Sequence, residues 1–275
     1  MTTIVISIGG RCVAQAVALA AVTMFGLCTV KADDIAYMTI GNGGNFGTID
    51  LNTGVFTFLG NSGQTLSGMA VENGTLYGSS YLNGTGSLFT INPANGSLTT
   101  VGTSNVDFNE FGSTTTSGLY AMDTNANLYS INPNTGAPKL IGATGLGFGT
   151  WSALSNNAST LYFADGANLY TINTSTGAAT LVGNMGGSQM GGLVMEGGVL
   201  YGGENTPSFA VATLDSITGV ATTGPDVTGQ NAGEFYGLAP NPLPVPEPPA
   251  WSLIGVGGVA LLGMMLRKKH RTAHG

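Results

Sequence analysis

The long middle of the chain lacks cysteine and histidine. Cys12 and Cys28 lie within the first 32 residues, and His270 and His274 lie within the last six. The middle segment therefore cannot hold a disulfide, a thiol nucleophile, a Ser-His-Asp triad or an ordinary zinc site. These exclusions follow from the residue inventory alone.

Basic side chains are almost as scarce in the same segment. Between Asp33 and Pro246, Lys139 is the only basic residue, against thirteen Asp and Glu. So acidic a segment repels phosphate backbones, and we expect no nucleic-acid partner.

Although only 8% of the chain is charged, 43% is apolar, which argues against disorder. With 45 glycines and no helical periodicity, the pattern predicts an all-β fold of short strands and tight turns.

The first 32 residues have the features of a signal peptide. An apolar run extends from Cys12 to Val30, and small residues at the −3 and −1 positions predict signal-peptidase cleavage after Ala32. A retained membrane anchor is the alternative interpretation. A lipoprotein signal at Cys28 is less consistent with the sequence, because Leu27 is a poor residue before a lipidated cysteine.

The last 35 residues divide into three parts. A proline-rich linker at 241–249 contains Pro246, Glu247 and Pro248, and residues 250–266 form an apolar run of about 17 residues, the short limit for a transmembrane helix. The tail at 267–275 follows, and its positive charge predicts that it stays cytoplasmic while the acidic domain lies outside. The basic residues of the tail are Arg267, Lys268, Lys269 and Arg271.

This three-part tail resembles the PEP-CTERM sorting signal of Gram-negative bacteria that make exopolysaccharide. The resemblance covers about the last 30 residues and rests on Pro246-Glu247-Pro248, the apolar run and the basic end. It implies processing by an exosortase, a membrane cysteine protease. We therefore expect an inner-membrane-anchored precursor that is transferred to the cell surface or the extracellular matrix. A plain C-terminal anchor with a chance Pro-Glu-Pro is the alternative.

Residues 33–240 contain five copies of one unit. Each copy has an apolar residue, then Asp or Asn, then a glycine four residues later, and a second glycine follows after six residues, or five in the last copy. We interpret these glycines as turn residues and not as phosphate loops, because no lysine or helix pattern follows them. The first glycines are Gly54, Gly96, Gly136, Gly177 and Gly219, and the second are Gly60, Gly102, Gly142, Gly183 and Gly224.

A period of about 41 residues with four strands per unit is typical of a β-propeller blade. The first unit lacks an innermost strand, whereas a matching segment, 235–239, follows the last unit. We therefore predict a five-bladed β-propeller over residues 33–240, in which 235–239 completes the first blade and closes the ring. An open β-solenoid is the rival, and it would leave that segment without a partner.

Several acidic and aromatic residues are expected on one face of this ring, in the loops between blades and between each blade's second and third strands. Trp151 is the only tryptophan of the domain, and an aromatic ring among carboxylates suits sugar stacking. Carboxylates that only keep the surface soluble are the alternative. The candidates are Tyr81, Asp107, Glu110, Asp123, Trp151 and Glu234, with Asp165, Glu204 and Asp226 on the same face.

No cofactor is required by this sequence, although one loop has a calcium-like pattern. Asp123-Thr124-Asn125-Ala126-Asn127 offers alternate oxygen ligands, but it lacks the glycine and glutamate of an EF-hand and also fits a hairpin turn. We favour the turn.

Together these features predict an exported, non-enzymatic binding or structural protein at the surface or in exopolysaccharide. A glycan-active enzyme is one alternative, since Asp107, Glu110 and Glu234 could supply paired carboxylates. The segments expected to form the inner strands carry small or apolar residues, which weakens that alternative. A scaffold that binds another protein through its rim is a third hypothesis.

Overall fold

The computed structural model describes residues 4–8, 12–16, 34–41, 44–82, 85–114, 118–147, 151–156, 158–229 and 233–241. Residues Asp33–Pro244 form one compact unit; the two ends of the chain form another. In that second unit, β1 (Ile4–Ile8) pairs antiparallel with β2 (Cys12–Ala16). The expected cleavage site, the sorting motif, the apolar run 250–266 and the basic tail lie outside the described residues. No helix among the described residues is long and apolar enough to cross a membrane.

The described residues of the compact unit contain strands and no helix, which confirms the all-β prediction. The strands form five antiparallel groups of four, and each group has the same internal order. The groups are β23 (Phe235–Pro240) with β3 (Ile35–Ile40), β4 (Asn45–Asp50) and β5 (Val55–Asn61); β6 (Gly68–Glu72), β7 (Thr75–Leu82), β8 (Thr85–Ile91) and β9 (Leu98–Ser104); β10 (Glu110–Ser113), β11 (Leu119–Met122), β12 (Asn127–Ile131) and β13 (Pro138–Ala143); β14 (Ser152–Asn156), β15 (Leu161–Asp165), β16 (Asn168–Ile172) and β17 (Ala179–Asn184); and β18 (Gln189–Glu196), β19 (Val199–Thr206), β20 (Ala210–Leu214) and β21 (Ala221–Asp226).

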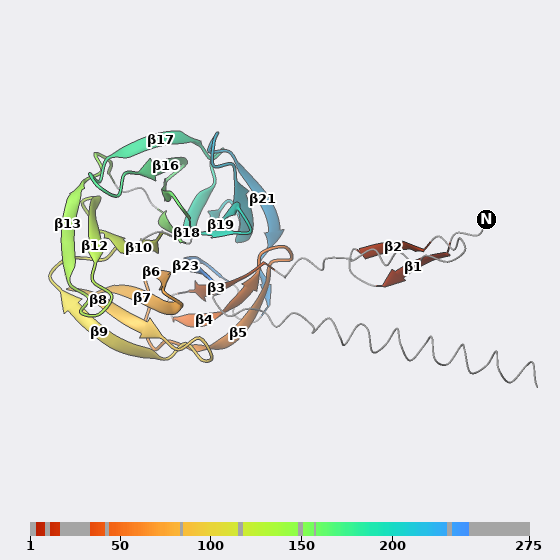
Figure 1. The fold of residues 1–275 in the computed structure, drawn as a ribbon, viewed down its shortest axis with the longest axis horizontal. Helices are drawn as coiled ribbons and strands as arrows, with labels where there is room; N and C mark the ends of the chain where they lie inside the picture. Colours follow the sequence, from red (N-terminus) through yellow and green to blue (C-terminus); the bar gives the residue numbers. More distant parts are fainter. Residues whose placement is uncertain are drawn as a thin grey trace, which may run out of the picture. The chain divides into compact units, whose positions relative to one another are not determined.

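The five groups stand around a common centre (Figure 1). Strands β23, β6, β10 and β18 lie near the centre, whereas β5, β9, β13, β17 and β21 lie along the rim. Ser155 of β14 pairs in parallel with Leu193 of β18, so two of the groups join into one eight-stranded sheet. The other inner strands are aligned in the same direction, because Gly68 lies beside Phe111, Gly112 beside Leu154 and Gly192 beside Gly237. Every inner strand therefore starts at the same end of the ring.

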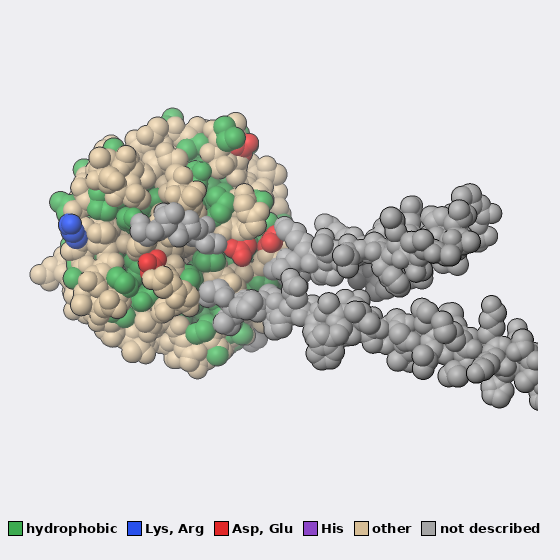
Figure 2. Space-filling view, viewed as in Figure 1, with side chains coloured by type: hydrophobic (Ala, Val, Ile, Leu, Met, Phe, Trp, Pro, Cys, Tyr) green, Lys and Arg blue, Asp and Glu red, His purple; other side chains and the backbone are tan. Residues whose placement is uncertain are grey.

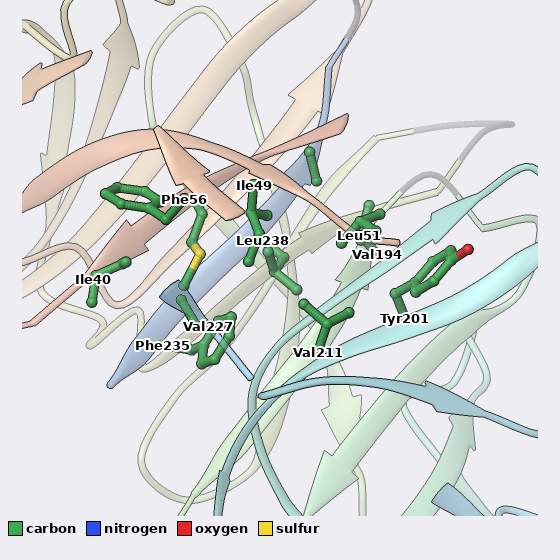
Figure 3. Packing of buried hydrophobic residues seen from close by; sticks show 12 residues of the cluster. Ile40, Ile49, Leu51, Phe56, Val194, Tyr201, Val211, Val227, Phe235 and Leu238 are labelled. Atoms are coloured by element: carbon green, nitrogen blue, oxygen red, sulfur yellow. The ribbon is translucent and has the colours of Figure 1, made fainter. Parts of the chain in front are cut away.

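Hydrophobic side chains are buried between consecutive groups, because each sheet has to cover both of its faces. One cluster, for example, combines Ala70 and Leu88 of the second group with Phe111 and Leu119 of the third. Figure 3 shows the cluster between the last and first groups, where Phe235 and Leu238 of β23 pack among residues of both. Each interface is thus a thin apolar layer, and the hydrophobic effect holds neighbouring sheets face to face.

The predicted turn after each third strand is present in all five groups. In the third group, the Asn132 side chain accepts a hydrogen bond from the Asn134 backbone N–H at 2.9 Å, and the Gly136 N–H bonds to the Asn132 carbonyl at 2.8 Å. Gly136 has φ +69°, a left-handed conformation that glycine adopts without strain. The first glycine of each repeat is therefore a turn residue, as expected.

The second glycine of each repeat is not a turn residue, and that part of the prediction is wrong. Gly102 lies inside the rim strand β9, where it pairs with Leu88 just after a bulge. A Cβ atom there would overlap the carbonyl oxygen of Thr135 in the turn of the next group. Gly60, Gly142 and Gly183 meet the following turns in the same way. These glycines allow each sheet to approach the turn of its neighbour.

The ring closes between the last and first groups. Strand β23 pairs antiparallel with β3, with Pro240 opposite Ala36, which confirms the predicted pairing of 235–239 with the first unit. At the rim, β22 (Thr228–Gly229) pairs in parallel with β5. Just before β3, Asp34 accepts a hydrogen bond from the Tyr201 hydroxyl of the last group at 3.1 Å. Three separate contacts therefore connect the last group to the first, and we call this junction the seam.

Replacing Gly102 with alanine should destabilise the domain, because the new methyl group would collide with the Thr135 backbone and cannot rotate away. We expect a loss of about 1–3 kcal/mol, the usual cost of overpacking. Gly147→Ala is the matched control, since nothing lies within 4 Å of a Cβ at Gly147. Thermal unfolding followed by circular dichroism would measure both. Equal melting temperatures for the two variants would contradict the close-approach explanation.

Candidate functional site

The five inner strands enclose a narrow central channel. Each contributes at least one lining residue, including Gly68, Glu110, Leu154, Gly192 and Tyr236. The cavity between them has a volume of only about 10 Å³, which is room for roughly one water molecule. We call the end of this channel at which the inner strands begin the mouth. A ligand larger than water has to lie across the mouth and not within the channel.

Asn156, at the end of β14, fills the channel deeper inside. Its amide nitrogen donates to the carbonyl oxygens of Met69 on β6 and Leu238 on β23, both at 2.7 Å, and to that of Leu193 on β18 at 3.4 Å. Its amide oxygen accepts from the Ser113 hydroxyl on β10 at 3.2 Å. One buried side chain therefore connects all five inner strands.

Glu110 is the first residue of β10 and lies buried at the mouth. The Ser152 hydroxyl donates to its Oε1 at 2.7 Å. Burial raises the pKa of the Glu110 carboxyl well above its ordinary value of 4.5, and the charge of nearby Asp165 raises it further. The hydrogen bonds from Ser152 and from the Leu154 backbone oppose this rise in pKa without cancelling it. The carboxyl can therefore hold a proton in conditions where a surface glutamate has lost it.

Trp151 precedes β14 and meets Tyr236 of β23 across the mouth. Their ring centroids are 5.9 Å apart with an interplanar angle of 76°, an edge-to-face pair. The Tyr236 hydroxyl donates to Glu234 Oε2 at 3.1 Å. Burial, together with this hydrogen bond and the charge of Glu234, raises the pKa of Tyr236. All three residues are partly exposed, so a carboxylate is fixed beside an accessible aromatic pair.

Two more of the predicted acids lie at the same end of the strands, and a third lies at the rim. Asp165 ends β15 and pairs with Ser152, next to Glu110. Glu204, on β19, is fully buried, and neither of its carboxyl oxygens has a hydrogen-bond partner. Asp226 ends β21 at the rim, where it is exposed. Of the full predicted set, Glu110, Trp151, Glu234 and Asp165 therefore come together around the mouth.

Asp107 and Asp123 lie together but do not line the channel: Asp107 is in the loop before β10, and Asp123 is in the hairpin between β11 and β12. Thr124 connects them by donating to Asp107 at 3.4 Å. Both oxygens of Asp123 accept hydrogen bonds from its own hairpin, including the backbone N–H groups of Asn125 and Asn127 and the hydroxyl of Tyr129. These hydrogen bonds within the hairpin are those of a turn, the interpretation that we favoured for residues 123–127. Among the described residues, no group of three or more His, Cys, Asp or Glu could hold a metal ion.

Tyr81 lies near the end of β7, and its side chain lies outside the described part of the structure.

Three residues of the site were not predicted: Ser152, Asn156 and Tyr236. For Tyr236 a signal exists, because the inner-strand segments align at Gly68, Gly192 and Gly237. The residue before this glycine is small in the other two segments and aromatic only at Tyr236.

No protein-family model matches the chain, and no curated protein matches it in sequence. A Bacteroides thetaiotaomicron protein of unknown function has a similar structure, with a TM-score of 0.54 and 17% identity. The match covers 76% of this chain and 62% of the other, so this chain spans less than two thirds of that protein. A nidogen/laminin complex structure matches with a TM-score of 0.50 and 10% identity, over 74% of this chain and 97% of that one. These identities support the fold alone, a β-propeller built from repeats.

Glu110 should make stability depend on pH. Above pH 4.5 the unfolded carboxyl releases its proton while the buried one keeps it, so rising pH favours unfolding until the raised pKa is passed. In this window, we expect the free energy of unfolding to fall by up to about 1.4 kcal/mol per pH unit, relative to Glu110→Gln. Urea unfolding of both proteins from pH 4 to pH 8 would measure the difference. A difference that stays constant over this range would show that Glu110 titrates normally.

Proposed function

We propose that this chain is an exported, five-bladed β-propeller that acts at the cell surface or in exopolysaccharide as a non-enzymatic binding module. Its ligand is a carbohydrate that lies across the mouth of the central channel. The aromatic pair of Trp151 and Tyr236, held beside Glu234, is the observation that carries this proposal. Sugars bind proteins through stacking of their apolar faces on aromatic rings and hydrogen bonds from hydroxyls to carboxylates.

The five-blade assignment is supported by the strand groups. Each of the five groups has four antiparallel strands and one rim turn of the same geometry. The inner strand of the first group comes from the C-terminal end of the domain, the arrangement that closes a ring and leaves no inner edge exposed. An open solenoid would need β23 to be unpaired.

The channel geometry favours binding over catalysis. Pockets that enclose small-molecule substrates usually have volumes of about 300–1,000 Å³. The channel cavity of about 10 Å³ is far below that range. A polymer, in contrast, needs only a platform on which one or two sugar rings rest. The partly exposed rings of Trp151 and Tyr236 can supply such a platform.

The chain enters and leaves the domain at the end of the ring away from the mouth. Ala36, near the start of β3, is paired with Pro240, the last residue of β23, whereas the mouth is formed where β23 begins. The predicted signal peptide and sorting tail therefore connect to the domain at the same end. The first and last strands of the domain thus meet away from the mouth, which suits a protein attached through its C-terminal region.

A glycan-active enzyme is the second candidate, and the Glu110 carboxyl favours it. A buried acid that keeps its proton is what a glycosidase needs as a general acid. Under this hypothesis, the purified chain would release reducing ends from polysaccharides and Glu110→Gln would abolish the release. Binding without any release, in wild type and variant alike, would favour the binding module.

The carbohydrate proposal predicts that Trp151→Ala weakens binding by about fivefold or more, because truncating a central aromatic contact costs more than about 1 kcal/mol. Glycan-array binding of residues 33–245, followed by titration of the best ligand, would measure the effect. Phe58→Ala, which removes an exposed aromatic from the rim strand β5, serves as the control and should bind normally. If the wild-type domain binds no glycan, the carbohydrate proposal is wrong.

The sorting proposal makes a separate prediction. In a host that has an exosortase, the mature protein should lack residues 267–275, because cleavage near Pro246-Glu247-Pro248 removes the apolar run and the basic tail. Mass spectrometry of the C-terminal peptide would show this. Replacing Glu247 with alanine should leave the tail attached. Recovery of wild-type protein that still carries the basic tail would mean that the tail is only an anchor.

A further inference from the structure

We propose that the carbohydrate bound at the mouth carries amino groups, so that its ligand class is a cationic, amine-bearing polysaccharide. This inference rests on the proposed function and adds the charge of the ligand to it. Four observations support it: the charge of the domain, the aromatic pair, the position of Glu234 and the unpaired carboxyl of Glu204.

The charge of the whole domain sets the first constraint. Residues 33–240 contain thirteen acidic side chains and one lysine, a formal net charge of −12. On the face seen in Figure 2, acidic side chains appear at several places, whereas basic atoms appear at one place near the edge. Such a field repels anionic polymers and attracts cationic ones. Uronic-acid and phosphate-bearing polysaccharides are therefore poor ligands.

The mouth itself combines two chemical features that favour an ammonium group. Aromatic faces attract cations through the ring quadrupole, and Trp is the strongest side chain in this respect. Glu234 lies next to that surface, positioned by the Tyr236 hydroxyl at 3.1 Å. A carboxylate has about four acceptor positions, so one hydrogen bond leaves it able to bind an ammonium group as well. A sugar amine resting on the aromatic pair would thus have both a π-face and a counter-charge.

Glu204 provides an independent indication that a positive group is missing. Its side chain has no exposed surface, and neither carboxyl oxygen is hydrogen-bonded. On β19, Gly202 two residues earlier faces Met190 and Leu214, whose cluster also contains Ala153 of β14. By strand alternation, Glu204 lies on the same side of β19 as Gly202, toward the fourth group, and it pairs with Met190 near the start of β18, at the mouth end of the strands. An unpaired buried carboxylate is costly, and a cationic ligand at the mouth would reduce that cost.

The test compares two oligosaccharides that differ only in the amine. The full chain, purified in detergent, is titrated with hexamers of β-1,4-linked glucosamine and with the N-acetylated hexamer. We expect the amine form to bind at least about tenfold more tightly, and its affinity to fall as salt is raised from 50 to 500 mM, because salt screens charge pairs. The N-acetylated form should show little dependence on salt.

Two matched variants locate the effect. Glu234→Gln keeps an acceptor for Tyr236 but removes the charge, and should lower affinity for the amine form about fivefold or more without changing the N-acetylated form. Glu72→Gln removes the same charge at the other end of the ring, in the hairpin between β6 and β7, and should leave both affinities unchanged.

The outcomes separate this inference from the proposed function. Equal affinities for the two hexamers would overturn the amine inference and leave carbohydrate binding intact. Binding of neither hexamer, nor of any glycan on the array, would overturn both. An equal loss from Glu234→Gln and Glu72→Gln would overturn the inference as well, since attraction would then come from overall charge and not from the mouth.

Discussion

The close approach of neighbouring sheets is the constraint on which the rest of this structure depends. Sheets can stand around a common centre only if they meet both at the rim and along the axis. At the rim, a glycine in each of four outer strands leaves room for the carbonyl of the next turn. At the centre, the Asn156 amide bonds to four other inner strands. Between these two radii, clusters of buried apolar side chains fill the space between neighbouring sheets.

At the seam between the last and first groups, the sheets also approach closely, but a different glycine makes the contact. The last repeat has its second glycine after five residues instead of six, and Gly224 contacts its own sheet. Here the turn glycine of the first group, Gly54, meets the Asp226 carbonyl on the last rim strand. The Gly54 carbonyl also accepts from the Thr228 N–H at 3.0 Å. The irregular spacing in the sequence therefore marks the place where the ring closes.

The sequence predicted the strands, the repeat and the closing pair of β23 and β3, because these follow from periodic patterns and from one unmatched segment. It could not assign the second glycine, since spacing alone does not distinguish a turn from a close approach between sheets. Trp151 was identified by being unique in the domain, but its partner Tyr236 is 85 positions away and joins it only through ring closure. Asn156 gave no signal in a chain rich in asparagine, because its role comes from strands distant in sequence.

The same closure that stabilises the ring also determines where a ligand can bind. Because Asn156 occupies the channel, the interior has no room for a sugar. The polar and aromatic side chains that differ between copies of the repeat therefore lie where the inner strands begin. They include Glu110, Tyr236 and the residues before β14. Strand pairing at those positions uses the backbone and not the side chain, so the side chains can differ without changing the pairing. The repeated architecture thus has one chemically distinct region, made by a few positions at its axis, and the proposed carbohydrate binding depends on the charge and aromatic character of those positions.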